Sequence, residues 1–279
     1  LSSEIATTLG GRYMIHEVYP YSFVEYLKAS NIDAKAKNAI YTHGKDIVRL
    51  CNTYFQHGGL PETVCLKEPR SWMSNLFSKI FFGDLVARYR IRNDYALRVM
   101  IRKMAESVKQ PLSFSRIASI VSSTGKKLST DATIDYVGYM TDTWLILPYE
   151  NLFGKLQDKE SNRKYYFTDN GLLHLFLVDA DTSLLENMVA IYLYETYGED
   201  LYYYNDNIEV DFCLFEYGKA IQVSYSIQDD KTFERETKAL IVYAKRFDCK
   251  ELFIITMDEE KEINLDGNII QIIPLWKML

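Results

Sequence analysis

The sequence predicts a mixed α/β protein in which helical segments come first and strands dominate later. Two successions of predicted helices and strands indicate this fold class. Three helices followed by two strand-like runs are expected between residues 97 and 168. A helix, a hairpin, a second helix and a further strand are expected between residues 184 and 257. Alternation of helical and strand periodicity in one chain is typical of α/β modules.

The three helices and two strands expected between residues 97 and 168 are predicted from apolar spacing and from capping residues. Apolar side chains recur at helical spacing from Leu97 to Val108, and Pro111 ends that helix. Ser113 and Ser129 are expected to cap the next two helices. Strand-like runs follow at residues 144–149 and 164–168. Three helices and then a β-hairpin indicate a winged-helix-like domain.

The elements expected between residues 184 and 257 include a β-hairpin at Ile208–Ser226. Side chains alternate in a strand, so we expect Val210, Phe212 and Leu214 on one face and Glu209, Asp211 and Cys213 on the other. In the second strand, Gln222 and Ser224 oppose the apolar residues. Asp211 is therefore predicted to lie across the sheet from Gln222 and Ser224.

Composition restricts the class of protein. The chain has 279 residues, 48% hydrophobic and 25% charged, which suits a globular protein of two domains. No apolar run is long enough to cross a bilayer, and the first residues carry neither a signal-peptide pattern nor an initiator Met, so we expect a fragment or a processed product. The four cysteines form no CxxC pair, which argues against zinc and disulfides and predicts a cytoplasmic location.

Charge is distributed unevenly along the chain. Residues 67–147 hold thirteen basic and seven acidic residues, a net charge of +6. Residues 148–279 hold thirteen basic and twenty-five acidic residues, a net charge of −12. Two interpretations stay open: the two regions attract each other, or the basic region contacts phosphate groups.

Several short motifs occur in an order that resembles a known family. The chain is similar to the C-terminal part of AAA-type (AAA_14-like) ATPases that carry a DUF4143 domain. The matching pieces are Ser2-Ser3-Glu4-Ile5, Gly11-Arg12, Tyr19–Leu27, Gly58-Gly59-Leu60-Pro61-Glu62, Asp169-Asn170-Gly171-Leu172, Leu184–Val189, Glu209–Phe212, Ile221-Gln222-Val223, Arg235-Glu236 and Ile273-Pro274-Leu275-Trp276.

The resemblance implies three parts. Residues 1–66 would be the remnant of an ATPase domain and a helical linker, residues 67–180 a winged-helix-like domain, and residues 181–279 a module like PD-(D/E)XK, or restriction-endonuclease-like, nucleases. No GxxxxGK[ST] phosphate loop is present, so ATP and Mg²⁺ would bind in a part outside this chain. Arg12 is the candidate for a contact with nucleotide. The expected partners are that ATPase domain and a further protein or DNA, with no membrane.

The resemblance also implies a degenerate nuclease site. Phosphodiester hydrolysis needs carboxylates that hold a metal ion and a lysine that stabilises charge. Glu186 and Asp211 would be the metal ligands, while Gln222 and Ser224 stand where an acid and the lysine are expected. Lys238 is a candidate for a migrated lysine. The set is incomplete, so the site is predicted to be inactive.

Nucleic-acid binding depends on where the basic residues lie. The third predicted helix, Ser129–Asp142, carries three aspartates and no basic residue, which disfavours insertion into a major groove. The basic residues of the region cluster earlier, at Arg88, Arg90, Arg92, Arg98, Arg102 and Lys103. These side chains are candidates for contact with nucleic acid or with the acidic C-terminal region.

We therefore expect a non-catalytic regulatory or interaction region of an AAA-type ATP-binding protein, without a cofactor of its own. The alternatives are a metal-dependent DNA nuclease with an altered active site and a nucleic-acid-binding module that does not cleave.

Overall fold

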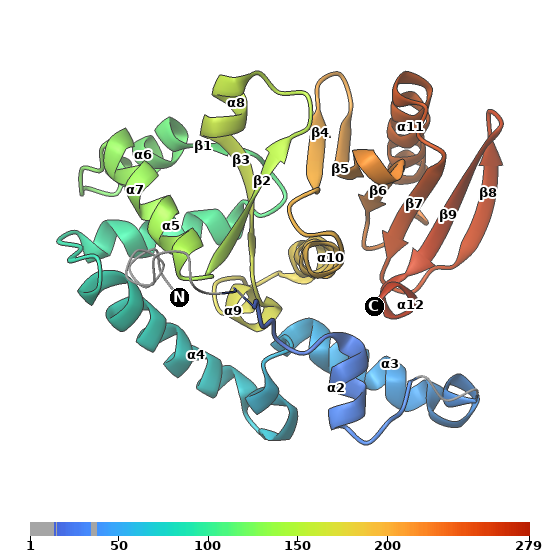
Figure 1. Cartoon of the computed structure of the whole chain (residues 1–279), viewed down its shortest axis with the longest axis horizontal. Helices are drawn as coiled ribbons and strands as arrows, with labels where there is room; N and C mark the ends of the chain where they lie inside the picture. Colours follow the sequence, from blue (N-terminus) through green and yellow to red (C-terminus); the bar gives the residue numbers. More distant parts are fainter. Residues whose placement is uncertain (1–13, 15, 35–37) are drawn as a thin grey trace.

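A computed structural model describes residues 14, 16–34 and 38–279. Arg12, the predicted nucleotide contact, lies outside the described residues. Within them, the strands form one nine-stranded mixed sheet with the order β1-β3-β2-β4-β5-β6-β7-β9-β8. Figure 1 shows α10 end-on near the centre, with α2 and α3 below it and the last strands on the right. No helix in the described part is both long and apolar enough to cross a bilayer.

The first described elements form a small helical layer. They are α2 (Phe23–Ala29), α3 (Ala39–His57) and the 3-10 turn η1 (Pro61–Cys65). Ser22 and Glu25 form a capping box at the start of α2, which satisfies backbone donors that the helix itself cannot. Gly58 has a φ of 76°, and its neighbour Gly59 lies against the carbonyl of Tyr21. The two glycines therefore permit the close turn after α3.

A long helical segment and three capped helices follow. They are α4 (Pro69–Lys79), its continuation with π-helical turns η2 (Ile80–Ala87), α5 (Asp94–Glu106), α6 (Phe114–Ser123) and α7 (Thr130–Asp142). The side chains of Asn93, Ser113 and Ser129 accept hydrogen bonds from the first turns of α5, α6 and α7. The two serine caps expected from the sequence are confirmed.

A three-stranded unit closes this region. It consists of β1 (Leu112–Ser113), β2 (Ile146–Asn151), α8 (Leu156–Ser161), β3 (Asn162–Phe167) and the short helix α9 (Asn170–His174). β3 pairs antiparallel with both β1 and β2. The two strands expected at residues 144–149 and 164–168 are confirmed, each shifted by about two residues.

The remaining elements are the other six strands of the sheet and the helices between and after them. They are α10 (Asp181–Tyr197), β4 (Tyr202–Asn205), β5 (Glu209–Leu214), η3 (Phe215–Tyr217), β6 (Lys219–Val223), α11 (Asp230–Phe247), β7 (Glu251–Thr256), β8 (Lys261–Leu265), β9 (Asn268–Pro274) and α12 (Leu275–Met278). The predicted helices and strands are confirmed. β8 was not among the expected strands. It pairs with β9 through a turn at Asp266 and Gly267, which both have positive φ.

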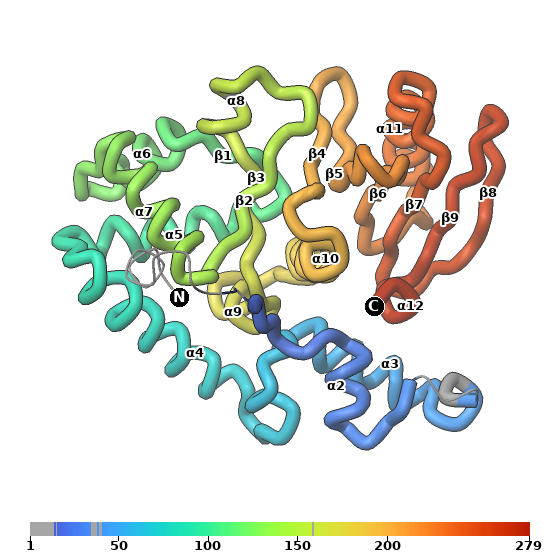
Figure 2. Tube along the Cα trace, in the orientation of Figure 1, coloured from blue at the N-terminus to red at the C-terminus, as the bar shows by residue number. Residues whose placement is uncertain are grey.

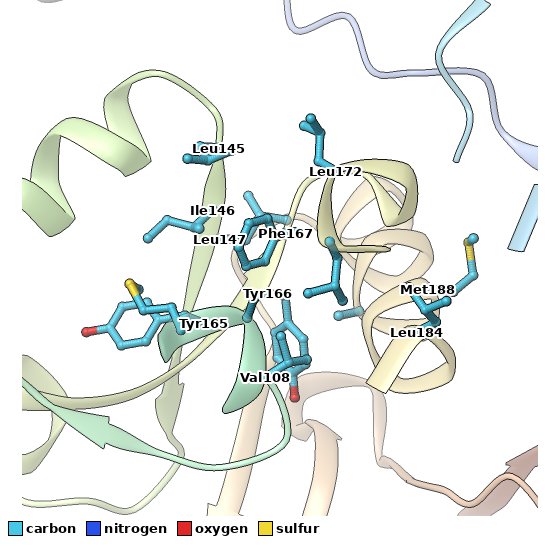
Figure 3. Close-up of a cluster of buried hydrophobic side chains, with 14 of the residues drawn as sticks. Val108, Leu145, Ile146, Leu147, Tyr165, Tyr166, Phe167, Leu172, Leu184 and Met188 are labelled. Atoms are coloured by element: carbon cyan, nitrogen blue, oxygen red, sulfur yellow. The ribbon is translucent and has the colours of Figure 1, made fainter. Parts of the chain in front are cut away.

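One hydrophobic core extends across the expected boundaries near residues 66 and 180. β2 pairs in parallel with β4, so the strands on either side of residue 180 share a sheet. Figure 3 shows Leu147 of β2 and Phe167 of β3 in one cluster with Leu172 of α9 and Leu184 of α10. The continuous tube in Figure 2 shows the same close approach of these elements. The division into three domains stays a prediction.

Buried amides fasten this core to α3. The side-chain nitrogen of Asn170 donates to the carbonyls of Phe55 and Leu184 at 2.9 and 3.0 Å, and its oxygen accepts from Asn187 at 2.9 Å. Asn187 also bonds the backbone N–H and C=O of Phe167. Both side chains are fully buried, so every hydrogen bond they lose leaves an unpaired group.

Asn170→Ala should therefore lower the free energy of unfolding by about 3 kcal/mol, because three buried groups lose their partner together. Chemical denaturation monitored by circular dichroism measures this change. Asn52→Ala, at an exposed position of α3, is the matched control and should stay within about 0.5 kcal/mol of wild type. Equal effects of the two substitutions would show that the buried amides do not fasten α3.

Candidate functional site

A buried lysine surrounded by carboxylates lies between β3, α10 and β5. The Nζ atom of Lys164 is 3.2 Å from Glu186 Oε1, 3.0 Å from Glu209 Oε1 and 3.2 Å from Asp211 Oδ1. The Lys164 side chain is fully buried, while 45% of the Glu209 side chain is exposed. We call these four residues the Lys164 cluster. It brings together two residues expected from the sequence, Glu186 and Asp211.

A β-bulge directs Asp211 into this cluster. Tyr202 is opposite Cys213 and Tyr204 is opposite Val210, so Tyr203 faces both Asp211 and Phe212. An extra residue in one strand reverses the alternation of side chains beyond it. The expected faces of β5 are therefore only partly confirmed. Phe212 and Leu214 share the main core, and Glu209 and Asp211 both face Lys164, as expected. Val210 and Cys213 were expected on opposite faces, but they pack together under α11.

The side chains of Asp211 and Gln222 replace part of the pairing between β5 and β6. The backbone N–H of Val223 donates to Asp211 Oδ2 at 2.9 Å. The N–H of Asp211 donates to Gln222 Oε1 at 2.8 Å, and Gln222 Nε2 donates to the carbonyl of Glu209 at 3.0 Å. Gln222 and Asp211 do lie opposite each other, as the sequence predicts. Their polar atoms are used to hold the two strands together.

The two other candidates lie outside the Lys164 cluster. The hydroxyl of Ser224 donates to the carbonyl of Ser226 at 2.9 Å, a local contact after β6 ends. Lys238, the candidate for a migrated lysine, is exposed on α11. The lysine comes instead from β3, 22 residues before Glu186. Lys164 was not identified from the sequence; the signal that could have pointed to it is a lysine at the start of the aromatic run Tyr165–Phe167.

The charges of the cluster are set by burial and by mutual attraction. Burial alone would lower the pKa of Lys164, but Glu186, Asp211 and Glu209 outweigh it and raise that pKa above its ordinary value. Burial raises the pKa of Glu186 to about 7, while Lys164 and the hydroxyl of Tyr166 oppose this change. The Tyr166 hydroxyl donates to Glu186 Oε1 at 2.8 Å.

A fourth carboxylate, that of Glu236 on α11, lies near Asp211 and Glu209. Glu236 is buried, and burial raises its pKa, while a hydrogen bond from Arg235 opposes the change. Arg235 and Glu236 form an ion pair at 2.5 Å. The motif Arg235-Glu236 thus forms a local ion pair near the start of α11.

The donor set does not fit the Mg²⁺ that an active nuclease requires. The Lys164 ammonium contacts all three carboxylates at 3.0 to 3.2 Å and stands where a cation between Glu186 and Asp211 would bind. Mg²⁺ needs oxygens at about 2.1 Å in octahedral geometry. Across residues 16–34 and 38–279, no group of three His, Cys, Asp or Glu side chains is arranged to hold a metal ion. We therefore derive no metal-dependent step from this site.

The basic residues of the middle region have several separate contacts. The Arg98 guanidinium lies 4.3 Å from the centre of the Phe81 ring, and Arg88 lies 5.4 Å from that of Tyr89. Lys103 pairs with Glu106 at 3.5 Å. Three further arginines have exposed side chains: Arg90, Arg92 and Arg102. Half of the six candidates thus contact the protein itself, and binding of nucleic acid by the others stays a prediction.

Lys164→Met should destabilise the protein by about 4 kcal/mol at pH 7.5, because it leaves buried carboxylates without their cation. The loss should be smaller at pH 5, where carboxylates without a neighbouring ammonium take up protons. Urea denaturation at both pH values measures this difference. Lys238→Met, exposed on α11, is the control and should change little at either pH. A loss independent of pH would contradict the charge argument.

Comparisons with known proteins give similarity without an established activity. A family model described as a domain of unknown function (DUF8612) matches residues 48–186, from α3 to the Glu186 of the cluster. An uncharacterized protein of Methanocaldococcus jannaschii is 28% identical over 99% of this chain and 66% of its own length. An uncharacterized protein of Haemophilus influenzae is 30% identical over 62% of this chain and 42% of its own length.

These relatives are longer than the chain, which spans 66% of one and aligns with 42% of the other. No solved structure matches the chain at a significant level. The chain is thus similar to a family of unknown function and to two uncharacterized proteins, one archaeal and one bacterial.

Proposed function

We propose that this chain is a non-catalytic regulatory or interaction region of a cytoplasmic, AAA-type ATP-binding protein, and that it contains a nuclease-like module without nuclease activity. One observation carries the proposal: the ammonium of Lys164 occupies the centre of the only carboxylates that the nuclease pattern provides. The Lys164 ammonium is covalently part of the chain, so it cannot dissociate into solvent as a bound metal ion can. In this proposal the cluster stabilises the fold and does not hold a catalytic metal ion.

The polar atoms around the cluster support the same conclusion. Asp211 uses one carboxylate oxygen for Lys164 and the other for the backbone of Val223. Gln222 uses both ends of its amide for the backbone of β5. A scissile phosphate or an attacking water would have to displace these bonds, and each loss leaves a half-buried polar group unpaired.

The order and pairing of elements support the two expected modules. α5, β1, α6 and α7 precede β2 and β3, and β3 lies between β1 and β2 in the sheet, which is the order of a winged helix. α10, the hairpin β5–β6, α11 and β7 follow in the order expected of a nuclease-like module. The exposed Asp131 and Asp135 of α7 disfavour contact between that helix and DNA, so a protein partner is preferred.

The ATPase activity would belong to another part of the protein. This chain contains no phosphate-binding loop, and the relatives it matches continue beyond the aligned region. ATP and Mg²⁺ are thus proposed for that other part. In this proposal the chain responds to conformational changes of the ATP-binding part and transmits them to a partner.

An assay with Mg²⁺ or Mn²⁺ on single- and double-stranded DNA tests the absence of nuclease activity. We expect no cleavage above that of the Asp211→Ala variant, purified in the same way to control for contaminating nucleases. Metal-dependent cleavage by the wild type that disappears in Asp211→Ala would overturn the proposal and establish an altered nuclease.

Binding of nucleic acid without cleavage is the second candidate, because Arg90, Arg92 and Arg102 have exposed side chains in the basic region. If it holds, replacing all three with Gln should weaken binding of a labelled duplex and reduce the slope of log K against log salt by about 3. Fluorescence anisotropy at several salt concentrations measures this slope. Our proposal expects no binding at 150 mM salt and no difference between wild type and variant.

A further inference from the structure

A second site lies away from the Lys164 cluster, where six segments meet (Figure 1). They are the segment before α2, the turn after α3, the helical segment α4–η2, the start of β2, α9 and α10. It contains a cavity of about 280 Å³. The wall of this cavity is mainly apolar and includes Leu76, Ile80, Leu172 and Ile191. This volume suits one long side chain rather than a cofactor.

Three aromatic rings line the same cavity. The ring of Tyr19 makes edge-to-face contacts with Trp144 and with Tyr194, both with centroids 6.2 Å apart. Trp144 has a φ of 56° and remains 41% exposed. Residues other than glycine rarely adopt positive φ, so the fold places this large ring at the surface at a conformational cost. The faces of aromatic rings attract cations.

A carboxylate without a cation completes the wall. Glu195 is half-buried on α10 and has neither a hydrogen bond nor an ion pair with any residue that the structure describes. Burial, together with the smaller effect of the nearby carboxylates of Glu25 and Asp169, raises the pKa of Glu195 to about 7. Asp169 differs, because its oxygens accept hydrogen bonds from the backbone N–H groups of Gly59, Gly171 and Leu172.

A larger cavity of about 630 Å³ adjoins the first and shares Trp144, Leu147 and Tyr194 with it. Five acidic residues line the larger cavity: Glu17, Asp142, Glu150, Glu199 and Asp200. Its basic residue, Arg163, already pairs with Glu150 at 2.9 Å and with Glu160 at 3.1 Å. The joined surface is thus strongly negative beside an apolar, aromatic cavity.

We propose that the two cavities form a docking groove for a basic segment of a partner polypeptide. One arginine or lysine side chain of the partner fills the smaller cavity, with its aliphatic part against Leu76 and Ile80. Its cation lies between Trp144 and the carboxylate of Glu195. The flanking basic residues of the segment lie over the acidic residues of the larger cavity.

The charges and volumes favour a polypeptide. A small amine would fill the smaller cavity but would not neutralise the acidic residues of the larger cavity other than Glu150, which Arg163 already pairs with. Several basic residues in one chain neutralise both cavities. A carboxylate shielded from water gains more from a cation than an exposed one does. This inference does not depend on the Lys164 cluster, and its failure would leave the absence of nuclease activity untouched.

The test uses fluorescein-labelled hexa-arginine as the probe, with labelled hexaglutamine as the neutral control. We expect hexa-arginine alone to bind the wild type at 50 mM salt. Glu195→Gln and Trp144→Leu should each weaken binding about tenfold, because they remove the carboxylate and the aromatic face. Glu234→Gln, the same change at an exposed position of α11, should weaken it less than about twofold.

Binding should also be tighter at pH 8 than at pH 6 in the wild type, and this difference should shrink in Glu195→Gln. The titratable groups that face Glu195 are Glu25, Asp169 and the hydroxyls of Tyr19 and Tyr54, and these remain in the variant. Thermal unfolding checks that each variant is folded. If Trp144→Leu is not, Glu195→Gln decides, because it changes charge with little change in shape.

Three results would overturn the proposal. The first is no binding of hexa-arginine to the wild type at 50 mM salt. The second is equal weakening by Glu195→Gln and Glu234→Gln, which would assign binding to the net charge of −6. The third is n-butylguanidine binding as tightly as hexa-arginine, which would show that the cavity binds a small cation and would exclude a polypeptide as the ligand.

Discussion

The attraction between the Lys164 ammonium and three carboxylates is the interaction on which the arrangement of this protein depends. The lysine comes from β3, before residue 180, and the acids come from α10 and β5, after it. Breaking such a buried group by removing one partner is far more costly than breaking a pair on the surface. The cluster thus holds the strands of the middle region against the helix and hairpin that follow, beside the apolar core that they share.

The same constraint explains why a familiar arrangement of side chains loses its chemistry. A β-bulge directs Asp211 toward α10, and bulges next to catalytic sites serve this purpose in many enzymes. Here Asp211 bonds an ammonium and a backbone N–H, and Gln222 bonds the neighbouring strand. A frame that would position a metal ion positions an internal salt bridge instead. The fold is therefore consistent with several functions, and the site decides between them.

The buried amides and the proposed groove share one set of elements. Asn170 and Asn187 join α3, α9 and α10, and Asp169 binds the turn at Gly59 beside the smaller cavity. The walls of that cavity are therefore held by buried hydrogen bonds. A preorganised site loses less conformational entropy when it binds. A partner bound there would contact the segment before α2, the helical segment α4–η2 and α10 at once, so binding would be sensitive to any change in their relative positions.

The sequence by itself determined the fold class, most helices and strands, the serine caps and the position of Asp211 opposite Gln222. These follow from local rules, because apolar periodicity and capping residues act over a few neighbouring positions. Only the tertiary structure decided which lysine joins Glu186 and Asp211, since Lys164 and Asp211 are 47 residues apart and meet through a bulge that alternation does not predict. The same holds for β8, whose charged strand depends on pairing with β9, and for the groove beside Glu195, which six separate segments enclose.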